Sequence, residues 1–129
     1  MIYVSTDSSK NEVINLTVGD DAVFRVPMTT PCGDDYEMGP NEYLIFSVRE
    51  KPTEESPLLI DVESEKGSNR ISIKHEDTCD LQPGFYSADI QLMTEDNQRV
   101  TVWPYLTGSQ RTSGSNRKNF CLMTEVTRK

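Results

Sequence analysis

The sequence has a single histidine, His75, and few other groups suited to catalysis or metal binding. A histidine-dependent triad or a zinc site would have to use this residue, and zinc sites usually need more His or Cys ligands. No Ser or Cys in a strained turn accompanies it, and no Gly-rich loop that could hold a phosphate is present. We therefore expect a non-enzymatic protein without catalytic, metal-binding or cofactor-binding residues, and interpret His75 as the cap of a turn at a strand end.

Long apolar runs are also absent, and basic residues are outnumbered. No stretch approaches the roughly 20 apolar residues that span a bilayer, so we expect no membrane insertion. The N-terminus lacks a basic region followed by an apolar stretch, so a secretory signal is not expected. The 129 residues include 21 acidic and 13 basic side chains, a net charge of −8. Such a surface repels phosphate backbones, which argues against nucleic acid as a partner.

Cysteine is sparse and odd in number. The three residues Cys32, Cys79 and Cys121 are widely spaced and include no CxxC pair. Secreted disulfide scaffolds usually carry an even and denser set. Reduced thiols in a protein made in the cytoplasm are the simpler interpretation, and one bridge plus one free thiol stays open.

The dominant positive signal is an alternation of apolar and polar residues with period two, typical of half-buried strands. A single domain over residues 1–129 with roughly seven to nine short strands reads as an all-β Greek-key sandwich of the immunoglobulin or fibronectin-III type. The expected strands are Glu12–Val18, Ala22–Val26, Glu42–Glu50, Pro57–Glu63, Asn69–His75, Phe85–Met93, Arg99–Leu106 and Phe120–Val126.

The connections between these segments carry turn-forming residues. Gly19–Asp21 predicts a tight turn, and Lys66–Asn69 and Glu95–Asn97 look like hairpin connections. His75–Leu81 is long enough for one helical turn between strands. No other window shows a helical stripe.

A basic loop and two aromatic residues form the candidate interaction surface. Thr107–Lys118 is rich in Gly and Ser, contains no acid, and carries three basic residues, so we expect a flexible loop with locally reversed charge. If Val100 and Val102 point inward, the aromatic residues lie on the outer face of the sheet beside this loop, where they mark a protein interface or a sugar-stacking platform. The alternative is that they cover the core at the sheet edge. The candidate residues are Trp103, Tyr105, Arg111, Arg117 and Lys118.

The segment before Phe85 predicts a structural corner. In Greek-key sandwiches a Tyr near the start of a late strand bonds back to the backbone just upstream, which fixes the crossover between the sheets. Here Leu81 would fill the core, Pro83 and Gly84 would make the turn, and Tyr86 would donate the corner hydrogen bond.

Five motifs along the chain form a recognisable set. They are Gly19-Asp20-Asp21, Phe46-Ser47-Val48-Arg49, Ile71–Thr78, Leu81–Leu92 and Glu125-Val126-Thr127. Together they resemble the immunoglobulin-like N-terminal domain of phage baseplate upper proteins and related prophage tail proteins of Gram-positive bacteria, and the resemblance covers most of the chain. It implies a structural role in a tail baseplate, with other tail proteins or a second copy as partners and the virion tail as location.

Two features differ from this family pattern. The Thr107–Lys118 loop replaces a short link, and the chain ends shortly after the last strand, so a stand-alone domain or a fragment is expected. A second hypothesis, from another class, is an extracellular ligand-binding or carbohydrate-binding module that uses Trp103 and Tyr105.

Overall fold

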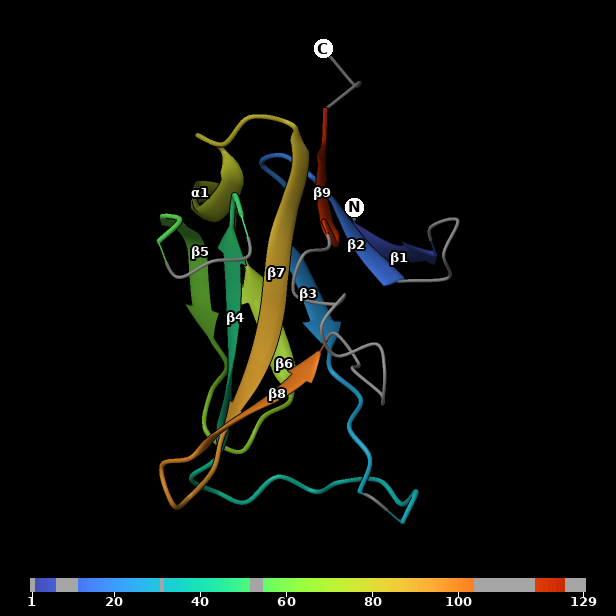
Figure 1. Cartoon of the computed structure of the whole chain (residues 1–129), viewed down its shortest axis with the longest axis vertical. Helices are drawn as coiled ribbons and strands as arrows, with labels where there is room; N and C mark the ends of the chain where they lie inside the picture. The colour runs from blue at the N-terminus through green and yellow to red at the C-terminus, as the bar shows by residue number, and fades with distance from the viewer. Residues whose placement is uncertain (1, 7–11, 31, 52–54, 104–117, 125–129) are drawn as a thin grey trace.

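A computed structural model describes residues 2–6, 12–30, 32–51, 55–103 and 118–124, and these residues form an all-β, sandwich-like protein (Figure 1). None of the described helices is long and apolar enough to cross a membrane. The elements are β1 (Ile2–Thr6), β2 (Glu12–Thr17), β3 (Ala22–Arg25), β4 (Tyr43–Arg49), β5 (Leu58–Glu63), β6 (Arg70–Ile73), α1 (His75–Thr78), β7 (Gly84–Met93), β8 (Arg99–Trp103) and β9 (Phe120–Met123).

Each strand expected from the period-two pattern is confirmed, with ends that differ by a few residues, and α1 is the expected helical turn. The strand that the sequence did not indicate is β1. Its segment is short and is followed by a polar stretch, so alternation alone gives a weak signal. Pairing with β2 over five consecutive positions, from Ile2–Leu16 to Thr6–Glu12, makes it a strand.

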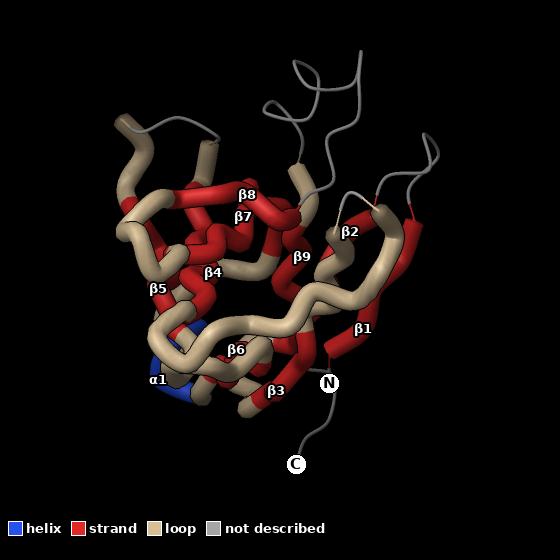
Figure 2. The backbone as a smooth tube through the Cα atoms, turned by 90° about the horizontal axis from the view of Figure 1, so that it is seen from below, coloured by secondary structure: helices blue, strands red, loops and turns tan. Residues whose placement is uncertain are grey.

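The strands form two layers, which are visible when the molecule is seen from below (Figure 2). The larger sheet has the order β1-β2-β9-β7-β4-β5, with β8 paired to β7, and the smaller sheet consists of β3 and β6. Most neighbours are antiparallel, whereas β2 and β9 run parallel. The chain therefore crosses between the layers after β2, β3, β5 and β6.

Aromatic side chains join the two layers at the core. Phe24 of β3 meets Phe46 of β4 edge-on, with ring centroids 5.7 Å apart, and Phe46 meets Phe120 of β9 at 5.8 Å. Edge-to-face pairs of this kind add to the stability gained by burial. Around them the inward rows of β2, β4, β6 and β7 are buried as the alternation predicted.

The connection at Lys66–Asn69 differs from the sequence prediction. β5 and β6 lie in different sheets, so this turn is a crossover between layers and not a hairpin. Its Gly67 has a φ of +80°, and its backbone N–H donates to the carbonyl of Glu42. In contrast, Glu95–Asn97 does connect paired strands, β7 and β8, and the hairpin prediction is confirmed there.

On one side β7 pairs with β4 from Ser87 to Met93, and on the other it changes partner half-way. Tyr86 and the residues before it pair with β9, whereas Ile90 and the residues after it pair with β8. The buried side chain of Asn119 lies between these two ladders. Its Oδ1 accepts from the N–H of Ala88 at 2.7 Å, and its Nδ2 donates to the carbonyl of Ala88 at 2.9 Å. One side chain thus replaces a missing strand neighbour.

The predicted corner is present at the start of β7. The Tyr86 hydroxyl donates to the carbonyl oxygen of Gln82 at 2.5 Å, and Leu81 packs against the core. Gly84 has a φ of +152°, a conformation that glycine adopts readily after Pro83. Burial raises the pKa of the Tyr86 hydroxyl, and the negative charge of Glu50 raises it further.

We expect the substitution Asn119→Ala to lower the free energy of unfolding by about 3 kcal/mol, because it leaves the buried N–H and C=O of Ala88 without partners. The matched control is Asn69→Ala, since Asn69 makes one long side-chain hydrogen bond, 3.4 Å to the carbonyl of Val26. Urea denaturation followed by circular dichroism measures both. If both variants lose the same free energy of unfolding, the side chain of Asn119 does not have the stabilising role described.

We expect Tyr86→Phe to lower the free energy of unfolding by about 1 kcal/mol at neutral pH. The raised pKa means that folding favours the protonated hydroxyl, so this stabilisation is present below the usual pKa of 10.0 and is lost as the pH rises through the raised value. The difference in the free energy of unfolding between wild type and variant should therefore become smaller at alkaline pH. Tyr43→Phe, at a half-buried tyrosine of β4, is the control and should not show this narrowing.

Candidate interaction surface

Trp103 packs into the core, which is the second of the two alternatives that the sequence left open, and its side chain is only 9% exposed. A β-bulge in the β7–β8 pair is the reason: Gln91 opposes Thr101, but the next pair is Ile90 with Trp103. The extra residue reverses the alternation, so Trp103 takes the inward position that Val102 would have had. The Trp103 indole N–H donates to Glu12 at 3.1 Å.

Most other members of the predicted surface lie outside the described residues. These are Tyr105, Arg111 and Arg117, together with the expected flexible loop up to residue 117. Lys118 is exposed, and its ammonium group donates to the backbone carbonyl of Glu50 at the end of β4. Of the predicted surface, the structure therefore describes only the buried Trp103 and the exposed Lys118.

His75 holds two loops together, in keeping with its interpretation as a cap. Its Nδ1 lies 2.7 Å from the carbonyl oxygen of Gly19, and its backbone N–H donates to the Asp21 carboxylate at 2.7 Å. The Gly19 N–H in turn donates to the buried hydroxyl of Thr78 at 2.8 Å. These contacts fasten the turn between β2 and β3 to α1.

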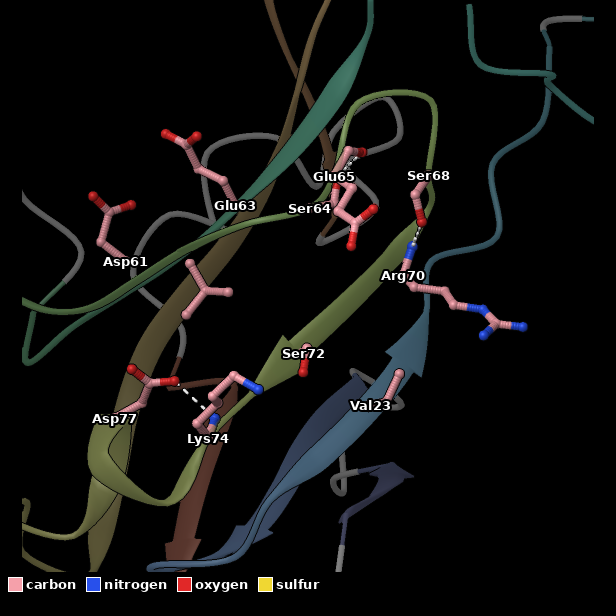
Figure 3. A pocket seen from close by; sticks show the side chains of 11 residues that line it. Val23, Asp61, Glu63, Ser64, Glu65, Ser68, Arg70, Ser72, Lys74 and Asp77 are labelled. Atoms are coloured by element: carbon pink, nitrogen blue, oxygen red, sulfur yellow. Dashed lines mark hydrogen bonds between the residues drawn. The ribbon is translucent and has the colours of Figure 1, made fainter. Parts of the chain in front are cut away.

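An open groove of about 790 Å³ runs between the edges of β5 and β6 (Figure 3). Its lining mixes both signs of charge, with Asp61 and Glu63 on one side and Arg70 on the other. The Arg70 N–H donates to the Ser68 hydroxyl at 3.2 Å, and the Lys74 N–H donates to the Asp77 carboxylate at 2.8 Å. These side chains occupy backbone donors at both ends of β6 and so blunt this edge.

The outer face of β1, β2, β9 and the start of β7 is different in composition, because its outward residues carry no charge. Cross-strand partners point to the same side of a sheet, so the pairing registers define this surface. We call it the uncharged face. It consists of Tyr3, Ser5, Val13, Asn15, Thr17, Cys121, Met123, Phe85 and Ser87.

Two aromatic residues lie at the ends of one row across this face. The row runs from Tyr3 through Asn15 and Cys121 to Phe85. Tyr3 is 45% exposed and Phe85 is 61% exposed, the highest value among the large hydrophobic residues described. The Asn15 amide donates to the Tyr3 carbonyl and, at 2.9 Å, to the Ser5 hydroxyl, which fixes β1 against β2.

The middle of the face is neutral. Burial raises the pKa of the Cys121 thiol, so this side chain stays protonated and behaves as a small hydrophobic group. The Tyr3 hydroxyl donates to the sulfur of Met123 at 3.6 Å. Charge begins at the border with β4, where Arg49 stands opposite Ser87. At the next outward residue of β7, Asp89, burial raises the pKa of the carboxyl and the nearby Arg49 guanidinium lowers it in part.

Sequence reasoning missed this face, although a signal for it exists. Tyr86 was identified as a core residue, which places its neighbour Phe85 on the outer side of the same strand. The second signal is that the residues alternating with the core row of β2, from Val13 to Thr17, carry no charge in a chain with net charge −8. What the sequence could not supply is the adjacency of β2 with β9, because these strands are more than a hundred residues apart.

We expect Asp89→Asn to raise the free energy of unfolding at neutral pH, because burial disfavours the charged carboxylate. The folded-state pKa is raised, so the carboxyl contributes stability below its usual value of 3.8 and loses it as the pH rises through the raised value. The free energy of unfolding of the variant should therefore exceed that of the wild type by more at neutral pH than at acid pH. Asp61→Asn, at an exposed residue of β5, is the control, and an equal pH profile in both variants would refute the prediction.

The chain has no match among models of known protein families, curated proteins or solved structures.

Proposed function

We propose that this chain is a non-enzymatic, immunoglobulin-like β-sandwich that docks other proteins in a phage or prophage tail baseplate, with the uncharged face as its docking surface. The observation that carries the proposal is the composition of this face. The chain has a net charge of −8, yet this face carries no charged side chain, and its aromatic residues Tyr3 and Phe85 are exposed. Val13, Asn15 and Ser87 are buried within the face, so the accessible surface is formed mainly by the two aromatic residues and the half-buried side chains between them. Charge-depleted patches with Tyr, Phe and Met are typical of the centres of protein–protein interfaces.

The strand order supports the immunoglobulin-like arrangement. One layer contains β3 and β6, and the other contains β9, β7, β4 and β5 side by side. β2 joins the larger layer through parallel pairing with the last strand. The Tyr86 corner stands where the chain crosses from β6 to β7, the position at which Greek-key sandwiches use such a tyrosine.

A rigid sheet is well suited to this role. The uncharged face is built on four neighbouring strands, and rigid elements position contact residues more accurately than loops do. The proposed location is the virion tail, because the resemblance in sequence implies assembly there. The extracellular carbohydrate-binding alternative is less well supported, since the buried ring of Trp103 is not available for stacking on a sugar.

We expect Phe85→Asp to weaken docking by about tenfold or more, because it replaces an exposed aromatic contact by a charge that must be desolvated on binding. The matched control is Val23→Asp, since Val23 is 60% exposed against 61% for Phe85 and lies on the other sheet. The probes are the purified proteins encoded by the genes on either side of this one, and biolayer interferometry measures their affinity.

Two outcomes would contradict the proposal. If none of the neighbouring gene products binds, the baseplate role is wrong. If Phe85→Asp and Val23→Asp weaken binding equally, docking does not use the uncharged face. Circular dichroism and thermal unfolding of both variants check that each one keeps its fold.

A further inference from the structure

β1 is a sheet edge without the usual protection. It stands at the end of the strand order and pairs only with β2 among the described strands (Figure 1). Natural proteins protect such edges with charges, prolines or bulges, because unpaired backbone groups recruit further strands. The segment Ile2–Thr6 has none of these, and its five pairs with β2 show no irregularity.

The other described edges do carry such protection. The β4–β5 pair has a register shift at Val48 and Arg49, and the β7–β8 pair has the bulge described above. Backbone donors at both ends of β6 are occupied by side chains. Charged residues lie on each of these edge strands: Asp61 and Glu63 on β5, Arg70 on β6, Arg99 on β8 and Arg25 on β3.

The hydrogen bonds of β2 show which backbone groups of β1 face outward. The N–H groups of Ile14 and Val18 donate to residues in or beside β9, at 2.9 and 3.0 Å. Alternate residues of a strand bond to opposite neighbours, so Val13 and Asn15 face β1 and bond to Ser5 and Tyr3. The N–H and C=O groups of the remaining residues of β1 therefore point to the free edge. These are Ile2, Val4 and Thr6.

We propose that β1 pairs antiparallel with β1 of a second copy of this chain, about a two-fold axis at Val4. This register places Val4 opposite Val4 of the other copy and Ile2 opposite Thr6. All of these residues have outward backbone groups, so each pair exchanges hydrogen bonds as an antiparallel ladder requires. A strand that meets its own copy about a two-fold axis is complementary to itself, which makes the contact isologous and closed.

The neutral, apolar side chains of β1 allow a second copy as the occupant. Val4 is 58% exposed and Tyr3 is 45% exposed, so both faces of β1 offer apolar surface at the edge. Two chains of net charge −8 repel each other over most of their surfaces, and a neutral strand lets them meet without opposing acids. Pairing joins the two sheets into one and extends the uncharged face across both copies.

This inference rests on the proposed function, because pairing at β1 doubles the uncharged face that is offered to other proteins. Analytical ultracentrifugation of the wild-type chain over a range of concentrations tests it directly. We expect a concentration-dependent dimer. A wild-type chain that remains monomeric throughout overturns the proposal.

The substitution Val4→Pro is the sharpest disruption. Proline removes the outward N–H of residue 4, whereas the ladder between β1 and β2 uses the N–H groups of other residues, so the fold is retained. We expect the dimer to weaken by at least about tenfold, because the central pair of the two-fold ladder loses its donors. Val4→Thr keeps the N–H and the β-branched shape, and it should dimerise as the wild type does.

Val4→Lys, a charge at the free edge, replaces the proline variant if circular dichroism shows that the latter is unfolded. A dimer that persists in the folded disrupting variant overturns the proposal. A monomeric Val4→Pro that still binds the neighbouring gene products leaves the proposed function intact. If Phe85→Asp loses this binding but still forms the dimer, the result supports the proposed function independently of the dimer.

A cross-link tests the register. In a background with serine at Cys32, Cys79 and Cys121, the substitution Val4→Cys places two thiols directly opposite each other. The Cα atoms of a hydrogen-bonded antiparallel pair lie about 5.5 Å apart, within the range of a disulfide. Mild oxidation should therefore give a covalent dimer on a non-reducing gel. Ser5→Cys, whose opposite residue is Tyr3, should not, and equal cross-linking at both positions contradicts the register.

Discussion

The backbone of β7 needs a hydrogen-bonding partner on each side along its ten residues, and the rest of the fold is arranged around this requirement. β4 pairs with Ser87–Met93 on one side, while β9 and β8 share the other side and leave a gap at Ala88. The Asn119 side chain closes this gap, and its own backbone N–H bonds to the Tyr86 carbonyl. Because β9 is held there, it can pair in parallel with β2, and β2 can carry β1.

The uncharged face is a consequence of this arrangement. Its strands come from both ends of the chain, and they are adjacent only because β9 lies between β2 and β7. The smaller sheet has two strands, so it covers the inner side of the central strands but leaves β1 partly uncovered, with Val4 exposed. A neutral outer face next to an uncovered neutral edge gives the molecule one side suited to contact with other proteins, while its remaining edges are charged or capped.

The polar and aromatic side chains that could be mistaken for a site serve the architecture. His75 and Thr78 fasten α1 to the turn at Gly19, and Trp103 packs inward with its indole N–H bonded to Glu12. The polar side chains of Ser68 and Asp77, in the groove between β5 and β6, are structural as well, because they accept hydrogen bonds from the backbone at the edge of β6. Buried or edge polar groups need such partners, which explains their positions without invoking a ligand.

The sequence alone determined the strands other than β1, most of their inward rows and the Tyr86 corner, because each depends on alternation or on residues a few positions apart. It did not determine which strands are neighbours. Turn-forming residues make a hairpin at Glu95–Asn97 but a crossover between the sheets at Lys66–Asn69. The inward turn of Trp103 was also decided by the tertiary structure, since one bulged residue reverses the alternation. The uncharged face and the free edge of β1 exist only once distant segments have paired, and that pairing depends on packing across the whole chain.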